Sequence, residues 1–215
     1  MALRKVSLVA GEYYHIYNRG NSKQTVFNNK EDYYRFIKLL FLSNGQGNFK
    51  VSNIRKEIFD FDRGEPIVNI GAYCLMPNHF HLLLTQTDEG SISKFMQKLS
   101  TGYSMYYNKK YERTGTLFEG KFKSEHVNND RYLKYLFSYI HLNPIKLIDS
   151  HWKEAGITDK NQAIKFLEQY QFSSYQDYLG QDRKQKKILN IKVFPKYFPV
   201  ANSFKKEVFD WLSFK

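Results

Sequence analysis

Two histidines, His79 and His81, stand one residue apart in the apolar stretch YCLMPNHFHLLL, residues 73–84. The stretch is typical of two strands joined by a Pro-Asn turn. Side chains two residues apart on a strand project from one face, so the imidazoles should point together while Phe80 and Leu82 point into the core. Such a pair can bind a divalent metal ion and leave coordination positions open for water or substrate oxygens. Two half-exposed histidines on a sheet surface are the alternative interpretation.

A tyrosine and an asparagine at helical spacing could complete that site. Tyr139 and Asn143 lie in LFSYIHLNPIK, residues 136–146, and are neighbours on one helix face. Pro144 places the amide near the helix end. An amide oxygen can complete the coordination of a metal ion, and the phenol one turn away can reach a phosphate bound to that ion. With 17 tyrosines in the chain, a packed ring is the default for any one of them, and His141, nearly opposite Tyr139, is interpreted as structural or surface.

Along the chain, segments in which apolar residues recur at strand spacing alternate with segments in which they recur at helical spacing, and these elements must position the four residues. We expect strands or hairpins at residues 12–20, 67–76, 79–85 and 114–127. Helices are expected at residues 29–42 and 92–111, and from Asp130 as N-cap to just before Pro144. This order predicts one α+β domain in which helices cover an antiparallel sheet, with further helices beyond Ser150.

The chain is strongly basic and rich in aromatic residues. Its 215 residues include 33 Lys and Arg against 21 Asp and Glu, for a formal net charge of +12, and 42% are hydrophobic. This composition predicts a packed core and excludes a disordered protein. Nucleic acid is the expected partner because basic residues are interleaved with aromatic ones along the chain. A generically basic soluble protein is the alternative.

Cysteine content and apolar runs indicate the compartment. Cys74 is the only cysteine, so an intrachain disulfide is impossible and a reducing compartment fits. The apolar run at the start is too short for a signal peptide, and no eighteen consecutive residues are apolar. We therefore expect a cytoplasmic protein without a membrane span.

The segments MPNHFHLLL and YIHLNPIK resemble the REP-associated tyrosine transposases, members of the HUH class of single-tyrosine transposases related to those of small insertion sequences. Three further segments match in the family's order: YHIYNRGNSKQTVF, YYNKKYERTGTLFEGKFKS and FSSYQDYLG. The resemblance covers roughly residues 12–180. It implies a ferredoxin-like or RRM-like antiparallel sheet with helices on one face. We expect a catalytic domain at residues 1–150 and a helical C-terminal extension at residues 151–215, family-like to about residue 180.

Carried over residue by residue, the resemblance identifies His79 and His81 as the metal-binding pair and Tyr139 as the nucleophile. Asn143 stands where relatives have a polar residue, in some a glutamine that completes the metal site. The implied cofactor is Mg²⁺ or Mn²⁺, and the implied partner is single-stranded or hairpin DNA. In the implied reaction the tyrosine attacks phosphorus, forms a 5′-phosphotyrosine and releases a 3′-hydroxyl, and another 3′-hydroxyl can later rejoin the strand.

Six basic residues are candidates for contacts to the DNA backbone. Lys121 and Lys123 flank Phe122 on the strand expected at residues 114–127 and should share a face. Arg19 follows a predicted strand in an NRG turn, where bidentate contact to a phosphate is feasible. The other candidates precede them in the chain: Lys109, Lys110 and Arg113. A solvated basic surface is the alternative for each, and the rings that stack on bases are not identified.

Several alternatives stay open. Tyr103, Tyr106 and Tyr107 compete with Tyr139, but none is followed by an amide four residues later. A noncatalytic nucleic-acid-binding module on the same fold would leave the histidines without metal. Histidine-triad hydrolases, two-histidine phosphoesterases and cupins are disfavoured because the additional residues that they require are not found at suitable spacing. The choice between a monomer and a homodimer is undecided.

Overall fold

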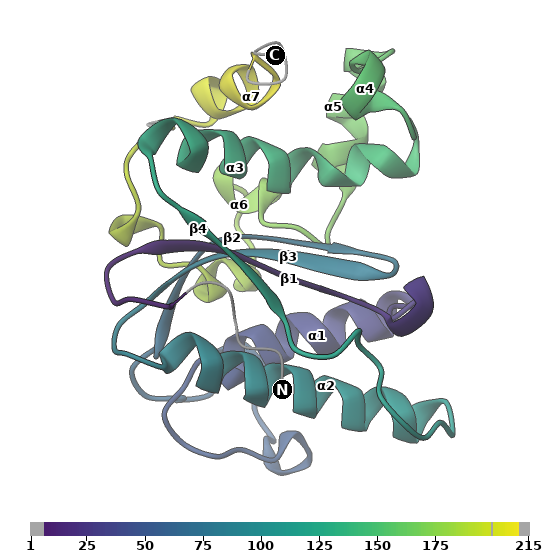
Figure 1. The fold of residues 1–215 in the computed structure, drawn as a ribbon, viewed down its shortest axis with the longest axis vertical. Helices are drawn as coiled ribbons and strands as arrows, with labels where there is room; N and C mark the ends of the chain where they lie inside the picture. The colour runs from purple at the N-terminus through teal and green to yellow at the C-terminus, as the bar shows by residue number, and fades with distance from the viewer. Residues whose placement is uncertain (1–6, 199, 211–215) are drawn as a thin grey trace.

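The computed structural model describes residues 7–198 and 200–210. Its centre is a four-stranded antiparallel sheet in the order β2-β3-β1-β4 (Figure 1). The strands are β1 (Tyr13–Arg19), β2 (Val68–Met76), β3 (His79–Gln86) and β4 (Lys123–Val127). The predicted hairpin is formed by β2 and β3, with Met76 paired to His79.

Helices surround this sheet, with α1 and α2 on one side and α3 on the other (Figure 1). The α-helices are α1 (Lys30–Ser43), α2 (Ser91–Lys110), α3 (Asp130–Leu142), α4 (Trp152–Ala155), α5 (Lys160–Gln169), α6 (Tyr175–Tyr178) and α7 (Ala201–Asp210). Short 3-10 helices occupy Asn21–Lys23, Val51–Asn53, Ile58–Asp60, Asn143–Leu147, Lys184–Ile188 and Ile191–Val193.

The face covered by α1 and α2 holds the largest part of the core. α1 begins at a capping box, in which the Asn29 side chain accepts from the Asp32 N–H and the Asp32 carboxylate accepts from the Asn29 N–H. Apolar residues of both helices then pack on inward-facing residues of β3, including Phe80, Leu82 and Leu84. The opposite face of β3 carries His79 and His81, followed by Leu83, as the alternation predicts.

Helices also cover that opposite face, which corrects the expectation of helices on one face only. Ala72, Cys74 and Leu83 pack there against residues of α3, among them Phe137 and Ile140. Nearly every residue of β2 and β3 is buried, so apolar side chains project from both faces and each face needs a cover. The α+β class, the antiparallel sheet and the helical C-terminal extension are confirmed.

The chain between α2 and α3 differs from the expected hairpin or strand. Only β4 is a strand, and before it Phe118 makes a single bridge to Gly20. Gly120 has a φ of +76°, which turns the chain away from an extended path. The N-cap of α3 is Asn129 rather than Asp130, because the Asn129 side chain accepts from the Tyr132 N–H over 2.7 Å.

The C-terminal helices share a hydrophobic cluster with the end of α3. Leu142 and Ile145 pack there with Trp152, Tyr175 and Phe204. The position of the segment that follows α3 is therefore fixed by residues from several C-terminal helices.

His141 belongs to this buried region. Its Nδ1 lies 2.8 Å from the Phe137 carbonyl oxygen and its Nε2 lies 2.7 Å from Ser174 Oγ. Both ring nitrogens are thus engaged inside the protein, and the structural interpretation of His141 is confirmed.

The boundary expected at residue 150 remains a prediction. Residues 1–6, 199 and 211–215, which belong to the two expected segments, lie outside the described residues. Within residues 7–198 and 200–210, no helix combines the length and the apolar character that crossing a membrane requires.

Candidate active site

The two histidines of β3 point to the same side of the sheet. The ring centroids of His79 and His81 are 5.0 Å apart. His81 is buried and His79 is partly exposed. On the neighbouring strand, Arg19 pairs with His79 and Tyr17 with His81, so β1 supplies the adjacent wall.

Each imidazole is oriented by a hydrogen bond at its Nδ1 atom. His79 Nδ1 donates to Asn78 Oδ1 over 2.7 Å, and His81 Nδ1 lies 2.8 Å from His15 Nε2. A hydrogen bond at Nδ1 fixes the ring and leaves Nε2 as the atom available to a metal ion. The arrangement therefore suits metal binding through both Nε2 atoms.

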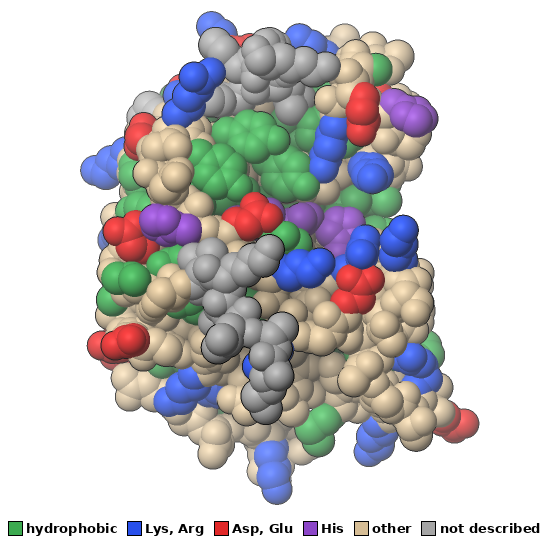
Figure 2. Space-filling model, in the orientation of Figure 1, with side chains coloured by type: hydrophobic (Ala, Val, Ile, Leu, Met, Phe, Trp, Pro, Cys, Tyr) green, Lys and Arg blue, Asp and Glu red, His purple; other side chains and the backbone are tan. Residues whose placement is uncertain are grey.

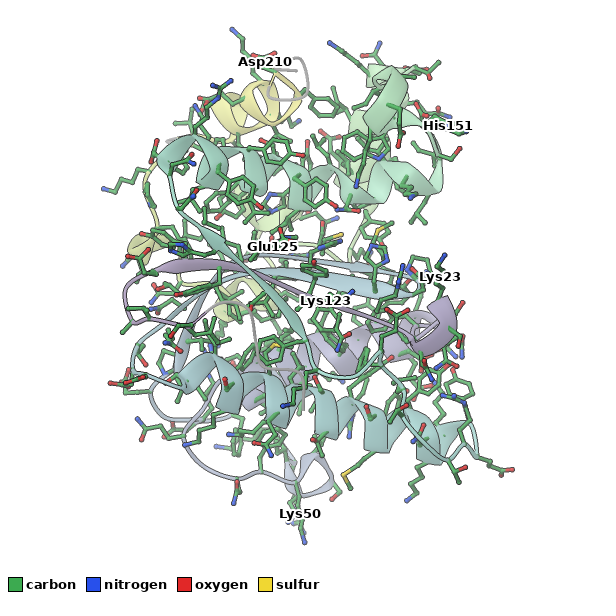
Figure 3. All side chains as sticks on the ribbon, in the orientation of Figure 1. Lys23, Lys50, Lys123, Glu125, His151 and Asp210 are labelled. Carbon is green, nitrogen blue, oxygen red and sulfur yellow. The ribbon has the colours of Figure 1, made fainter. Side chains whose placement is uncertain are left out.

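The orientation of the His15–His81 hydrogen bond follows from Glu125. His15 Nδ1 lies 3.6 Å from Glu125 Oε2, and hydrogen bonds from His15 and then Tyr17 lower the pKa of Glu125 to about 2. An ionised carboxylate can only accept a hydrogen bond, so His15 carries its proton on Nδ1, the atom that faces Glu125. His15 Nε2 is then the acceptor and His81 Nδ1 the donor of the hydrogen bond between the two rings. Glu125 lies on the side of β4 that faces α3 (Figure 3).

Burial keeps both candidate ligands in their neutral form. Burial first, and then the positive charges of Lys153 and Lys146, lowers the pKa of His79 to about 4. Burial and the neighbouring His15 hold the pKa of His81 well below its usual value. A neutral imidazole is the form that binds a metal ion, so neither histidine must lose a proton first near neutral pH.

The C-terminal end of α3 brings the tyrosine and the asparagine to the histidines. The Tyr139 ring meets the His81 ring edge to face, with centroids 5.5 Å apart and planes at 80°. Asn143 caps α3, is 1% exposed and lies within hydrogen-bonding reach of the His79 side chain. The structure thus brings together all four residues that the sequence singled out for chemistry.

These four residues line a cleft of about 720 Å³ in which basic side chains outnumber acidic ones. Five cationic side chains line it: Arg19, Lys23, Lys123, Lys146 and Lys153. Lys23 lies beside the turn between β2 and β3 (Figure 3). A concave site with this charge attracts a phosphate backbone.

The donor set fits a divalent ion with open coordination positions. Within residues 7–198 and 200–210, no three His, Cys, Asp or Glu side chains group into a metal site of their own. Two imidazole nitrogens and the Asn143 amide oxygen are instead the available donors. Such a set leaves coordination positions that water and phosphate oxygens can fill.

Sequence reasoning missed two residues that touch this set. His15 contacts His81 from β1, and Lys153 of α4 donates to Tyr139 Oη over 2.9 Å. His15 could have been noticed because YHIYN places it and Tyr17 on one strand face. The sequence carries no comparable signal for Lys153.

Of the six predicted DNA-binding residues, Arg19 and Lys123 line the cleft. Arg19 also donates two hydrogen bonds to the Glu119 carboxylate, over 3.1 and 3.0 Å. Lys123 is exposed at the start of β4. Their place beside the histidines is consistent with contacts to a strand bound in the cleft.

The other four predicted residues do not line the cleft. Lys110 pairs with Asp32 and Glu31 of α1, at 2.8 and 2.7 Å, and Arg113 lies over the Tyr107 ring. Lys109 is exposed near the end of α2. Lys121 lies in the bend before β4 and lines a separate hollow against α2, so the strand face expected to join it to Lys123 does not form.

The competing tyrosines belong to α2, on the far side of the sheet from the histidines. Tyr103 is fully buried and donates to the Val26 carbonyl oxygen. Tyr106 donates to Asp32, and Tyr107 donates to the Thr25 carbonyl oxygen. Tyr139 remains the candidate nucleophile.

Comparisons with known proteins identify the family and the fold of the chain. The chain matches the family model described as transposase IS200 like over residues 9–143, more than half of its 215 residues. A solved structure of a REP-associated tyrosine transposase bound to a REP hairpin has the same fold, with a TM-score of 0.54, 11% identity, and coverage of 91% of this chain and 89% of that one.

Two tRNA(His) guanylyltransferase structures are more distant. The enzyme from Saccharomyces cerevisiae gives a TM-score of 0.40 at 12% identity, covering 92% of this chain and 86% of that one. A bacterial tRNA(His) guanylyltransferase-like protein in complex with ATP gives a TM-score of 0.38 at 9% identity, covering 78% of this chain and 72% of that one. A search of curated proteins found no match. On the family match, which confirms the resemblance seen in the sequence, the chain belongs to the IS200-like transposases.

Proposed function

We propose that this transposase cleaves and rejoins single-stranded DNA through a covalent 5′-phosphotyrosine on Tyr139. The observation that supports this most strongly is the position of the Tyr139 ring, 5.5 Å from the His81 ring in a cleft lined by lysines. A nucleophile, candidate metal ligands and phosphate-attracting charges therefore meet at one point.

The residues of the cleft have three separate roles in this reaction: metal binding, nucleophilic attack and phosphate binding. His79, His81 and Asn143 would hold Mg²⁺ or Mn²⁺, which when bound polarises the scissile phosphate and neutralises charge on its oxygens. Tyr139 supplies the oxygen that attacks phosphorus. Lys23, Lys123 and Lys146 hold backbone phosphates on either side of the reacting one, at the positions where they line the cleft.

The covalent step explains how the strand can be rejoined. The bond from Tyr139 to phosphorus forms as the bond to the 3′-oxygen breaks, so the phosphodiester is exchanged rather than hydrolysed. A 3′-hydroxyl from another strand end can then attack the phosphotyrosine and release the tyrosine. No nucleotide cofactor is needed for either step.

The substrate is a single strand attached to a hairpin. The solved structure with the same fold holds a REP hairpin, which supports hairpin DNA as the substrate class here. The candidate ligands, the candidate nucleophile and five basic residues of the same chain line this cleft. The cytoplasmic location expected from the sequence suits a DNA substrate.

Incubation with end-labelled hairpin DNAs from around the protein's own gene tests this function. With Mn²⁺ or Mg²⁺, a 3′-end label should migrate with the protein on a denaturing gel, and a 5′-end label should appear on a shorter free strand. EDTA should abolish both products. Tight binding without cleavage across such DNAs, together with no metal binding at the histidines, would instead indicate a noncatalytic binding module.

A row of aromatic rings on α3 gives the single strand a further contact. The Tyr132 and Tyr135 rings stack at 6.2 Å and 18°, and the Tyr135 and Tyr139 rings at 5.9 Å and 26°. Tyr135 is 38% exposed. Hydrophobic side chains gather over α3 in Figure 2, with histidine side chains along the lower edge of the patch. The row leads from the nucleophile outward and offers flat faces to unpaired bases.

Tyr135→Ala should therefore weaken binding of single-stranded DNA by about 5-fold or more, since a stacked base contributes about 1–3 kcal/mol. Tyr135→Phe should bind like wild type because the ring is kept. Fluorescence anisotropy with a labelled strand measures both dissociation constants. Met105→Ala, which removes an exposed apolar side chain from α2, is the control. Equal affinities for the two Tyr135 variants would exclude stacking on this ring.

A further inference from the structure

We propose that Lys153 is a catalytic residue of this transposase, whose ammonium group stabilises negative charge on Tyr139 Oη during both cleavage and rejoining. The proposal rests on the proposed function, since it assigns a role in the reaction of Tyr139. It also addresses a chemical need: a free phenol, with a pKa of about 10, is a poor nucleophile at neutral pH.

The contact joins the cation directly to the reacting atom. Lys153 Nζ donates to Tyr139 Oη over 2.9 Å and lies 4.3 Å from the centroid of the same ring. A charged donor at this distance forms a stronger hydrogen bond to a phenolate than to a neutral phenol. The interaction therefore strengthens as charge develops on the oxygen, which is the requirement for stabilising a transition state.

The fold places Lys153 there through its neighbour Trp152. The Trp152 side chain is 2% exposed and packs in the cluster that includes Leu142 and Ile145 at the end of α3. α4 is thereby held against the segment that follows the nucleophile, and Lys153 projects from α4 into the cleft. Lys153 also lies outside residues 9–143, which the family model matches, so the motifs alone would not identify it.

The charge balance of the reaction assigns Lys153 a role other than that of a base. In cleavage the Oη–P bond forms and the P–O3′ bond breaks; the phenol proton passes to water, and the 3′-oxygen takes up a proton. In rejoining the attacking 3′-hydroxyl forms a P–O3′ bond and loses its proton to water; the Oη–P bond breaks, and its electron pair returns to Oη, which then takes up a proton. Lys153 keeps its proton throughout and balances the charge that Oη carries in either direction.

Lys146 provides a matched comparison because it lines the same cleft with the same charge but has no hydrogen bond to Tyr139 among those of the described residues. Lys153→Met should lower the rate constant of adduct formation at saturating DNA by about 100-fold, the usual loss for one such donor. Rejoining from purified adduct should slow by a similar factor. Lys153→Arg should restore most of both rates, and Lys146→Met should mainly raise the dissociation constant for DNA.

Single-turnover gels with excess protein give the rate constants, and anisotropy gives the dissociation constants. Because Lys153 is exposed, its replacement should leave the fold intact, which circular dichroism checks. Equal losses of rate at saturation in Lys153→Met and Lys146→Met would overturn the proposal and leave Lys153 as a phosphate contact. If the wild-type protein forms no adduct, the proposed function itself fails and this role fails with it.

Discussion

Replacing Tyr139 with phenylalanine is expected to abolish the covalent DNA adduct while leaving DNA affinity near that of the wild-type protein. The substitution removes only Oη, the atom that attacks phosphorus, and loss of a nucleophile costs about 10⁴-fold or more in rate. The ring that packs against His81 and stacks on Tyr135 is kept. Denaturing electrophoresis of labelled DNA detects the adduct, and anisotropy measures the affinity.

Two matched variants make this experiment specific. Tyr135→Phe removes a hydroxyl one turn earlier on α3 and should keep the adduct. Tyr106→Phe removes a hydroxyl on the other side of the sheet and should keep it as well. A persistent adduct in Tyr139→Phe would place the nucleophile elsewhere, whereas its loss in either control would point to damage of the fold.

The second large effect concerns the metal ligands. His81→Ala should lower metal-dependent cleavage by more than about 100-fold, because it removes a ligand rather than a residue that only orients one. His15→Ala, which removes the partner of His81 Nδ1, should cost about 10- to 100-fold. Calorimetric titration with Mn²⁺ should show weaker binding in the same order.

The same series contains its own control. His126 is a histidine of β4 that pairs with Glu12 at 2.8 Å and does not line the cleft, so His126→Ala should keep both metal binding and cleavage. Undiminished Mn²⁺ binding in His81→Ala would show that β3 is not the metal site. Equal losses of cleavage and of Mn²⁺ binding in His81→Ala and His15→Ala would mean that His81 acts through its hydrogen bond to His15 and not as a metal ligand.

The parts of the site that the sequence predicted are those that depend on local periodicity. Two residues on one strand share a face whatever the strand pairs with, so His79 and His81 could be placed together without knowing the fold. Tyr139 and Asn143 similarly share a helix face because they are one turn apart. That the two pairs meet on one face of the sheet was implied by the family resemblance, since no local pattern fixes which helix covers which face.

The features of the site that could not be predicted from the sequence depend on contacts between distant segments of the chain. The lysines of residues 108–124 look alike in the sequence, but Lys110 is bound to carboxylates of α1 whereas Lys123 faces the cleft. Lys153 reaches Tyr139 only because Trp152 is anchored in the C-terminal core. Charge and composition predict a nucleic-acid partner, but they do not say which cations remain available to it.

The prediction of helices on one face failed for a related reason. A continuous apolar run such as GAYCLM in β2 is buried on both faces, and the alternation that would mark a solvent-exposed face is absent. That pattern was present in the sequence and could have indicated a sheet covered on both sides. The identity of the second cover, α3 with the C-terminal helices, required the structure.

The most direct test of the proposed chemistry is to identify the amino acid that carries the DNA. The adduct formed with Mn²⁺ is digested with nuclease and trypsin, and the modified peptide is sequenced by mass spectrometry. The expected peptide is YLFSYIHLNPIK, residues 135–146, with the phosphate on Tyr139 and not on Tyr135. A phosphate on Tyr135 or on another peptide, or DNA cleavage without any modified peptide, would contradict a reaction through Tyr139.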